Sequence, residues 1–220
     1  MKIVIINGSS KGKDGNTDVL VKSLVKGAQA GGAETRNIFL NELKIEHCKG
    51  CHICWTRGPG QCVISDDMFD ILTLMGSADV IAFASPVYFG NISGMLKTFM
   101  DRMTMIGSPH STKNSVKESN QQLEPSESTA PQLMMISSCG FSDKSEFDVT
   151  SLWINKVAKK MNMKLIGEIY ATNGKAYNAS PELLDNKLLR NLQLIEDAGK
   201  EIASHRKLSA ETKDILEQLI

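Results

Sequence analysis

The chain has 220 residues, of which 41% are hydrophobic, and its 25 Lys and Arg residues balance 25 Asp and Glu residues. This length suits one α/β domain with a complete core and is too short for two domains that each have a full hydrophobic core. The zero net charge gives no sign of binding to nucleic acid or to an anionic membrane, so we expect a small partner. No run approaches the roughly 18 apolar residues of a membrane span, and no secretory signal is recognised, which predicts a cytoplasmic protein.

The first predicted unit is a strand, a polar loop and a helix. Residues 1–6 are apolar, and the loop Asn7–Thr17 is rich in glycine and hydroxyl side chains. Apolar residues then recur on one helical face until Gly31 and Gly32 end the helix, at Val19, Leu20, Leu24, Val25 and Ala28.

The loop of this unit is suited to an anion, because amide hydrogens and hydroxyls lie at the amino end of a helix, where the dipole favours negative charge. It has neither the spacing of a Walker loop nor the glycines of a dinucleotide fingerprint. We therefore expect it to hold a single phosphate, through Ser9, Ser10, Lys11, Asn16 and Thr17. The alternative is a solvated turn in which Asn16 or Thr17 caps the helix.

Cysteines dominate the next part of the chain. A short strand over residues 34–40 precedes a loop over residues 43–65 that contains four of the five cysteines, Cys48, Cys51, Cys54 and Cys62. Clustered cysteines without a secretory signal favour metal or redox chemistry over a disulfide framework. Asp66 and Asp67 then open a helix, where their charges suit its positive end.

Residues 79–84 are predicted to form a strand buried on both faces, followed by a ligand shelf and a helix. The shelf consists of Pro86, Val87, Tyr88, Phe89, Gly90, Asn91 and Ile92. Its proline and glycines would let backbone groups face a flat ligand, with Tyr88 and Phe89 packed on it. The alternative is an ordinary loop between strand and helix.

The last third of the chain begins with residues 107–130, whose polar composition cannot bury enough surface to fold alone. We interpret them as a mobile insertion, either a lid or a plain flexible loop. A strand at residues 133–136 then ends in Ser137, Ser138, Cys139 and Gly140. A helix follows at residues 145–161, with a buried side expected to comprise Phe147, Val149, Leu152, Trp153 and Val157.

A fifth strand at residues 164–171, a long helix starting at Pro181 and a short one capped by Ser209 complete the pattern. Strands that alternate with helices imply a doubly wound five-stranded parallel sheet with helices on both faces. In the common order 2-1-3-4-5, the loops after the first, third and fourth strands are neighbours at one edge. These are the loops that contain Ser9, Tyr88 and Ser138.

No catalytic side chain is predicted at this edge, since the residues offer no convincing general base and no nucleophile with a partner. His47 and His52 lie in the cysteine loop, and His110 and His205 fall in expected surface segments. A protein that supplies only positioning needs a cofactor to carry the reaction. A phosphate, a polar chain and a planar ring describe flavin mononucleotide, FMN.

Three motifs in order resemble the NAD(P)H-dependent FMN reductases of the flavodoxin-like fold. They are Gly8-Ser9-Ser10 to Asn16-Thr17, Ser85-Pro86-Val87-Tyr88 through Asp101-Arg102, and Ser137 to Phe141. The resemblance implies one FMN-binding domain over residues 1–220, with the phosphate at Ser9, Lys11, Asn16 and Thr17 and the isoalloxazine ring at Pro86 to Ile92 and Ser137 to Gly140. It also implies NAD(P)H as electron donor, a quinone, flavin, nitroaromatic or protein acceptor, and a homodimer or homotetramer.

The cysteine pattern, followed by Asp66-Asp67-Met68, is similar to the iron-sulfur flavoprotein branch of this family. Three cysteines at intervals of three can wrap one face of a [4Fe-4S] cluster, and Cys62 would close it. Two alternatives remain, namely thiols that are free, disulfide-bonded or structural, and zinc bound by four thiolates. Cys139 is expected to be a small buried residue.

Two other functions compete with the reductase. One is an iron-sulfur flavoprotein that carries electrons from a ferredoxin and never meets a nicotinamide. The other is a non-catalytic flavodoxin-like protein that only shuttles electrons or binds a partner.

Overall fold

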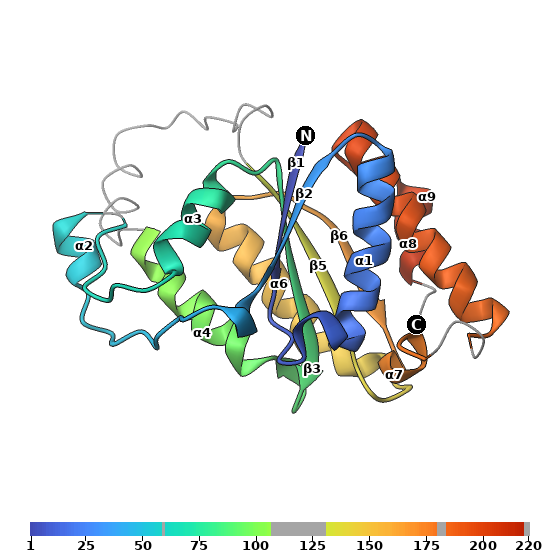
Figure 1. Ribbon diagram of the computed structural model, residues 1–220, viewed down its shortest axis with the longest axis horizontal. Helices are drawn as coiled ribbons and strands as arrows, with labels where there is room; N and C mark the ends of the chain where they lie inside the picture. Colours follow the sequence, from blue (N-terminus) through green and yellow to red (C-terminus); the bar gives the residue numbers. More distant parts are fainter. Residues whose placement is uncertain (59, 107–130, 180–183, 218–220) are drawn as a thin grey trace.

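The computed structural model describes residues 1–58, 60–106, 131–179 and 184–217 of the chain. A parallel sheet with helices on both faces forms its centre (Figure 1). Its strands are β1 (Lys2–Asn7), β2 (Glu34–Phe39), β3 (Val80–Tyr88), β5 (Gln132–Ser138) and β6 (Leu165–Ala171), in the order β2-β1-β3-β5-β6. The predicted 2-1-3-4-5 order is confirmed.

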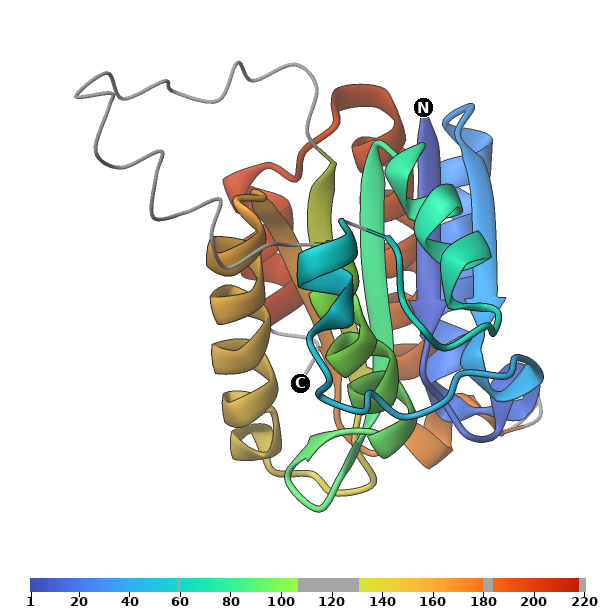
Figure 2. The same cartoon turned by 90° about the vertical axis from the view of Figure 1, so that its left-hand side faces the viewer.

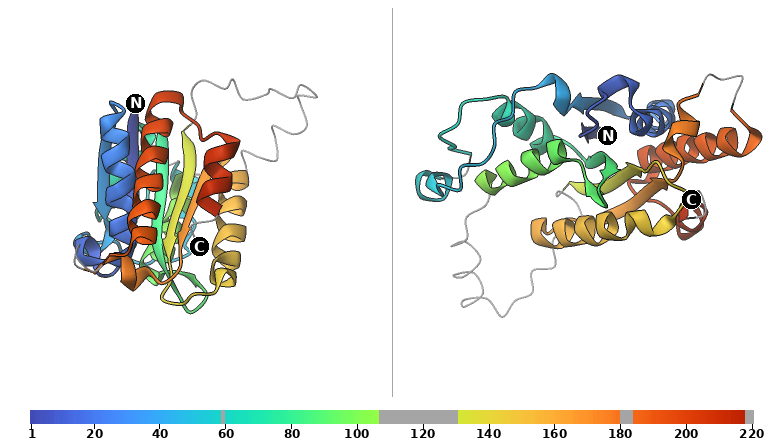
Figure 3. Two further views of the ribbon diagram at one scale, coloured as in Figure 1. Left: turned by 90° about the vertical axis from the view of Figure 1, so that its right-hand side faces the viewer. Right: turned by 90° about the horizontal axis from the view of Figure 1, so that it is seen from below.

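The parallel register brings the carboxyl ends of the strands to one edge of the sheet. In β1, Asn7 lies beside Phe39 of β2 and Ala84 of β3, and further along the sheet Ser85 lies beside Ser137 of β5. This carboxyl edge is at the bottom of Figure 1 and faces the viewer in the right-hand view of Figure 3. The loops that follow the strands are therefore neighbours, as the sequence predicts.

The first face of the sheet is covered by α1 (Asn16–Ala30), α8 (Asn186–His205) and α9 (Ala210–Glu217), as the left-hand view of Figure 3 shows. Apolar residues at helical spacing in α1 and α8 pack on alternate residues of β1, and the core of this face includes Ile3, Ile5, Leu20, Leu24, Ile195 and Ile202. The period of two along a strand is the reason that Val4 and Ile6 face the other side.

The second face is covered by α3 (Met68–Gly76), α4 (Gly94–Arg102) and α6 (Asp148–Met161). Phe83 of β3 and Phe99 of α4 are fully buried there, and each such side chain contributes about 2 kcal/mol of hydrophobic stabilisation. Figure 2 looks at this face, with the cysteine segment (residues 44–66) and its short helix α2 (Ile53–Arg57) in front of the layered core.

The structure corrects several predicted element boundaries. The strand expected over residues 79–84 continues to Tyr88, because β4 (Asn91–Ile92) folds back and pairs with it. The short helix α2 lies in the segment expected as a loop, and the short helix α7 (Gly174–Tyr177) was not predicted, since a helix of one turn leaves little periodicity. The long helix α8 begins at Asn186 rather than at Pro181, because the carboxylate of Asp185 accepts the Leu188 N–H and caps it.

The buried side of α6 also differs from the expectation. Val149 and Leu152 are 47% and 57% exposed, whereas α6 buries Thr150, Ile154 and Ala158. These three residues are four apart and form the stripe that meets the sheet. The predicted insertion at residues 107–130 lies outside the described residues.

In the part of the chain that the structure describes, no helix combines the length and the apolar character needed to cross a lipid bilayer.

Two glycines set the distance between α1 and α8. A Cβ added at Gly27 would overlap the carbonyl oxygen of Glu196, and one added at Gly199 would overlap the carbonyl oxygen of Leu24. The two helix backbones therefore touch directly. Glycine is needed at both positions because any side chain would force the helices apart.

We expect Gly199→Ala to lower the free energy of unfolding by about 2 kcal/mol, because the overlap separates two packed helices. Denaturant unfolding followed by circular dichroism measures this change. Gly76→Ala is the matched control, since a Cβ at Gly76 in α3 meets no atom within 4 Å. Equal stability of the two variants would contradict the close packing of α1 on α8.

Candidate functional site

Buried polar side chains hold the loop after β1 in place through hydrogen bonds. The Asn7 side chain donates to Asp18 at 3.2 Å and accepts the Ser9 N–H at 3.1 Å. At Gly8 the chain passes so close to α4 that an added Cβ would lie 2.7 Å from the Cβ of Leu96. The loop therefore has one backbone path, which only glycine at this position permits.

This loop leads to a helix end without a side-chain cap. Gly12 has a φ of +54°, the chain makes one turn of 3-10 helix at Gly12–Asp14, and α1 begins after Gly15. No side chain caps α1 at Gly15, so the alternative of a cap by Asn16 or Thr17 is wrong; both residues lie inside the helix. Of the first-turn amides of α1, that of Asp18 donates to the Gly15 carbonyl at 3.0 Å. Those of Asn16 and Thr17 have no acceptor within the helix and can bind an anion.

The shelf after β3 is a hairpin. Phe89 and Gly90 have φ values of +52° and +73°, as the two central residues of a tight type I′ turn require. Positive φ is uncommon for an aromatic residue, and Phe89 is also fully exposed. The hairpin thus exposes an aromatic side chain on a residue whose backbone conformation is energetically unfavourable, a combination typical of functional loops.

Ser93 joins the hairpin to the first loop. Its hydroxyl donates to the Gly8 carbonyl at 2.6 Å and accepts the Leu96 N–H at 3.1 Å, which caps α4. Its own N–H donates to the Ser85 hydroxyl at 2.9 Å. Ser93 was not among the predicted site residues, although a serine directly before a glycine and an apolar helix is an N-cap signal.

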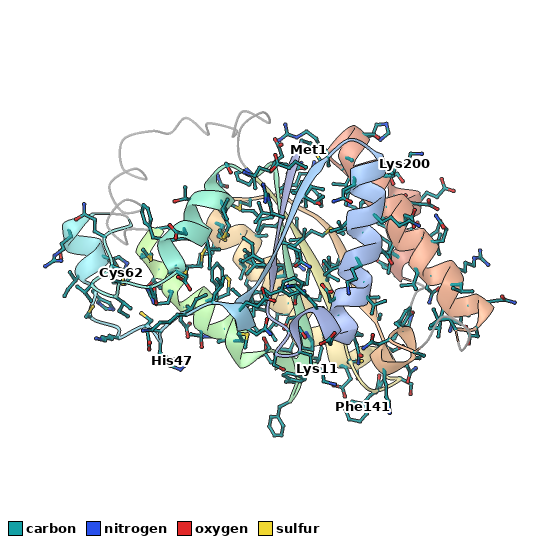
Figure 4. All side chains as sticks on the ribbon, viewed as in Figure 1. Met1, Lys11, His47, Cys62, Phe141 and Lys200 are labelled. Carbon is teal, nitrogen blue, oxygen red and sulfur yellow. The ribbon has the colours of Figure 1, made fainter. Side chains whose placement is uncertain are left out.

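The loop after β5 joins the same network. The Ser137 hydroxyl donates to the Ser85 carbonyl at 2.7 Å, and the hydroxyls of Thr17 and Ser138 are hydrogen-bonded at 2.8 Å. Across the edge, the hydroxyls of Ser10 and Tyr88 are 3.2 Å apart. All three loops therefore meet at the carboxyl edge, as the topology predicted. Figure 4 shows Lys11 and Phe141 at this edge.

The predicted site residues fall into two groups by exposure. The exposed ones are Ser10, Lys11, Tyr88, Phe89, Gly90, Asn91 and Gly140, and the half-buried ones are Asn16, Pro86 and Val87. The remaining ones are buried, namely Ser9, Thr17, Ile92, Ser137, Ser138 and Cys139. The hydroxyls of Thr17, Ser137 and Ser138 bond to neighbouring elements of the chain, so these side chains shape the site rather than face a ligand.

Cys139 is buried, as expected. Its thiol donates to the Phe141 carbonyl at 3.2 Å, and burial raises the pKa of the thiol above its usual value. A raised pKa keeps the thiol protonated, so Cys139 is a poor nucleophile.

The four clustered cysteines line one pocket on a different side of the molecule. Cys48 and Cys51 are exposed, while Cys54 and Cys62 are half-buried. Burial and then the neighbouring Cys62 raise the pKa of Cys54 above its usual value. Trp55 anchors the segment through its indole N–H, which donates to the Thr104 carbonyl at 3.0 Å. Figure 4 shows Cys62 far from Lys11 and the carboxyl edge.

All four are free thiols in the structure. Among the described residues, no three His, Cys, Asp or Glu side chains converge closely enough to hold one metal ion. Four thiolates around a [4Fe-4S] cluster each bind a different iron atom, so they lie farther apart than four thiolates around one zinc ion. The cluster, thiol and zinc alternatives for these cysteines therefore stay predictions.

An ion pair that the sequence analysis missed lies beside this pocket. Arg102 at the end of α4 and Asp66 are both 1% exposed in their side chains and are 2.5 Å apart. Burial raises the pKa of Asp66, but hydrogen bonds from Arg102, Glu46 N–H and Met68 N–H outweigh it and hold the pKa below its usual range. Asp66 therefore neutralises the buried charge of Arg102, in addition to accepting the Met68 N–H at the start of α3.

The histidines described here do not form a catalytic pair. His47 is exposed, with Nδ1 3.3 Å from the Thr98 hydroxyl, and His52 is exposed and stacks on Trp55. His205 is exposed at the end of α8.

Comparison with known proteins adds the family to this geometry. The family model described as NADPH-dependent FMN reductase matches residues 1–177. The chain is 41% identical over 102 residues to the iron-sulfur flavoprotein MJ1083 of Methanocaldococcus jannaschii, covering 46% of this chain and 51% of that protein. It is 37% identical over 106 residues to an iron-sulfur flavoprotein of Methanosarcina thermophila, covering 48% and 54%. The aligned part thus spans about half the length of the curated relatives.

Solved structures with the same fold include NAD(P)H:quinone oxidoreductase from Methanothermobacter marburgensis, with a TM-score of 0.63, 14% identity and coverage of 94% of this chain and 98% of that one. An FMN-dependent NADH-azoreductase from Bacillus anthracis in complex with FMN gives a TM-score of 0.62 at 18% identity, covering 92% and 100%. These similarities show a flavodoxin-like fold.

The family match covers most of the chain, and the sheet order and the three meeting loops agree with it. The chain therefore belongs to the NADPH-dependent FMN reductase family.

Proposed function

We propose that the chain binds FMN at the carboxyl edge of its sheet and is an FMN-dependent oxidoreductase that takes electrons from NAD(P)H. The observation that carries the proposal is the hydrogen-bonded meeting of three loops, which joins Gly8 to Ser93, Ser85 to Ser137 and Thr17 to Ser138. Family membership supports the same cofactor.

The phosphate end of the cofactor fits the loop before α1. The uncapped first turn of α1 offers amide hydrogens and a positive dipole end, and Asn16 lies there half-buried. Ser10 and Lys11 are exposed beside it and can reach an anion. Because the Thr17 hydroxyl is bonded to Ser138, we propose that Thr17 contributes its backbone N–H instead.

The ring end fits the hairpin and the loop after β5. Positions where a Cβ at Gly90 or Gly140 would lie have no atom within 4 Å, so their backbone is accessible to a flat ligand. Tyr88 and Phe89 provide exposed aromatic rings next to them. Bound FMN supplies hydride transfer, and the residues of this edge bind and orient it.

The electron acceptor is proposed by class, as a quinone, a free flavin, a nitroaromatic compound or a protein. The described edge offers no general base, so any proton would come from solvent. Three large apolar side chains are exposed on the loop after β5 and on α6. They are Phe141, Val149 and Leu152. We propose that a second copy of the chain covers such residues in a homodimer or homotetramer.

The cysteine pocket supports a second function, that of an iron-sulfur electron carrier. Several relatives bear the name iron-sulfur flavoprotein, and the four cysteines share one pocket. We propose that Cys48, Cys51, Cys54 and Cys62 hold a [4Fe-4S] cluster, which supplies one-electron transfer when bound. Helix α4 runs from Ser93 at the carboxyl edge to Arg102 at this pocket, a length of about 13 Å.

Anaerobic stopped-flow absorbance tests the reductase function. We expect NADH or NADPH to bleach the FMN bound to the chain, because the residues proposed to hold its ring, such as Tyr88, Gly90 and Gly140, are exposed. Bleaching only by a reduced ferredoxin would favour the electron carrier. A chain that rejects FMN would contradict both functions and favour a non-catalytic binding protein.

We expect Lys11→Met to weaken FMN binding by about fivefold, because an exposed charge contact contributes about 1 kcal/mol. Among the described residues Lys11 forms no ion pair, whereas Lys13 pairs with Glu42 at 3.0 Å. Lys13→Met is therefore the matched control. Fluorescence titration with FMN and with riboflavin measures the effect, and an equal loss for riboflavin, which lacks the phosphate, would contradict the assignment.

We expect Cys62→Ser to reduce the iron content after anaerobic reconstitution well below the about four atoms per chain of a complete cluster. Iron and acid-labile sulfide assays measure this. Cys139→Ser is the control, since Cys139 is buried in the loop after β5 and away from the cysteine pocket. Iron without sulfide in the unmodified protein would favour a different metal site.

A further inference from the structure

The side chain of Arg102 is the largest fully buried one in the described part of the chain. A buried guanidinium is stable only where charge and hydrogen-bond partners replace water. Arg102 lies at the last position of α4, where the helix dipole also favours a positive charge. The partners of Arg102 therefore indicate what this position does.

Those partners come from both ends of the cysteine segment. Nη1 donates to the Glu46 carbonyl at 2.9 Å, just before Cys48, and to Asp66 Oδ2 at 2.5 Å, just after Cys62. Nη2 donates to Asp66 Oδ1 at 3.1 Å. The guanidinium thus holds the two ends of the segment together and fixes both to α4.

Further hydrogen bonds strengthen the same junction. Asp66 Oδ2 accepts the Glu46 N–H at 2.9 Å, and Asp67 Oδ2 accepts the Lys44 N–H at 2.7 Å. Apart from these contacts the segment has little regular structure, since it contains only the five-residue helix α2. The middle of the segment is held separately, because Trp55 Nε1–H donates to the Thr104 carbonyl at 3.0 Å and Gly60 N–H donates to the Met105 carbonyl at 2.8 Å. The junction at Arg102 therefore fixes the two ends of the segment.

Arg102 also reaches into the cysteine pocket itself. Nη2 is 3.6 Å from Cys62 Sγ, and Arg102 lines the pocket together with the four cysteines. Among the described residues, Nε of Arg102 is buried without a hydrogen-bond partner. A buried donor of this kind is costly unless an acceptor completes it. A thiolate-bound iron-sulfur cluster is anionic and would supply that acceptor.

We propose that Arg102 is a positioning residue that fixes the cysteine segment on α4, holds Cys62 in the pocket and offers hydrogen bonds to an anionic thiolate-bound cluster. The cluster part rests on the proposed function. The clamp on the segment does not, because its contacts are made within the chain.

Two variants separate the clamp from the contact with Cys62. Arg102→Met combined with Asp66→Asn removes both charges together, so no unpaired buried charge remains to unfold the protein. Arg102→Lys keeps a positive charge that can pair with Asp66. It loses the planar guanidinium, which contacts Asp66 and Cys62 simultaneously. Lys97→Met is the matched control, since Lys97 pairs with Asp101 at 2.6 Å on the exposed side of the same helix.

Hydrogen-deuterium exchange of the apo proteins tests the clamp. In the double variant we expect the amides at the ends of the segment, those of Lys44 and Glu46 among them, to exchange about tenfold faster or more, while amides of β1 and β3 keep their protection. Arg102→Lys and Lys97→Met are expected to remain close to the unmodified protein. Unchanged exchange of residues 44–66 in the double variant would overturn the proposal.

Anaerobic reconstitution and redox titration test the contact with the cluster. We expect the double variant to lose most of its iron. We expect the loaded fraction of Arg102→Lys to titrate at a more negative midpoint potential, since a lysine that stays on Asp66 no longer places guanidinium N–H groups beside Cys62. An unchanged potential in Arg102→Lys would overturn the proposal, because a purely structural clamp leaves the potential unaltered. If the unmodified protein takes up no iron, the cluster assignment fails, and the exchange comparison alone decides whether Arg102 holds the segment.

Discussion

Hydrogen bonds from Ser85 and Ser93 hold the carboxyl edge of the sheet together. Ser93 binds the Gly8 carbonyl, caps α4 and donates its N–H to Ser85, while the Ser85 carbonyl accepts from Ser137. These groups are buried, so a group that lost its hydrogen bond would have no water to replace it and the fold would be destabilised. The three loops are consequently fixed relative to one another before any ligand arrives.

A preformed edge of this kind suits a protein whose cofactor carries the reaction. Buried hydroxyls at Thr17, Ser137 and Ser138 fix the backbone, whereas Ser10, Lys11 and the hairpin present exposed groups at the same edge. The division explains why so few side chains at the edge are reactive. An edge that is already fixed loses little conformational freedom when a ligand binds, which favours affinity.

Helix α4 connects this edge to the cysteine pocket. Its first turn is capped by Ser93 in the buried network, and its last residue, Arg102, holds the cysteine segment. Packing of Leu96 and Phe99 on the sheet fixes the helix in between. Both ends of one short, well-packed helix therefore carry a candidate redox site, so the fold itself sets their separation.

The sequence by itself determined the sheet order and the three loops at its edge, because alternating apolar strands and helices permit few topologies and glycine-rich turns mark strand ends. It also located the cysteine cluster. Only the tertiary structure decided that Ser93 joins two loops, that Val149 and Leu152 face outward, and that Arg102 pairs with Asp66. Those outcomes depend on contacts between residues far apart in the chain, and local periodicity carries no information about which distant groups meet.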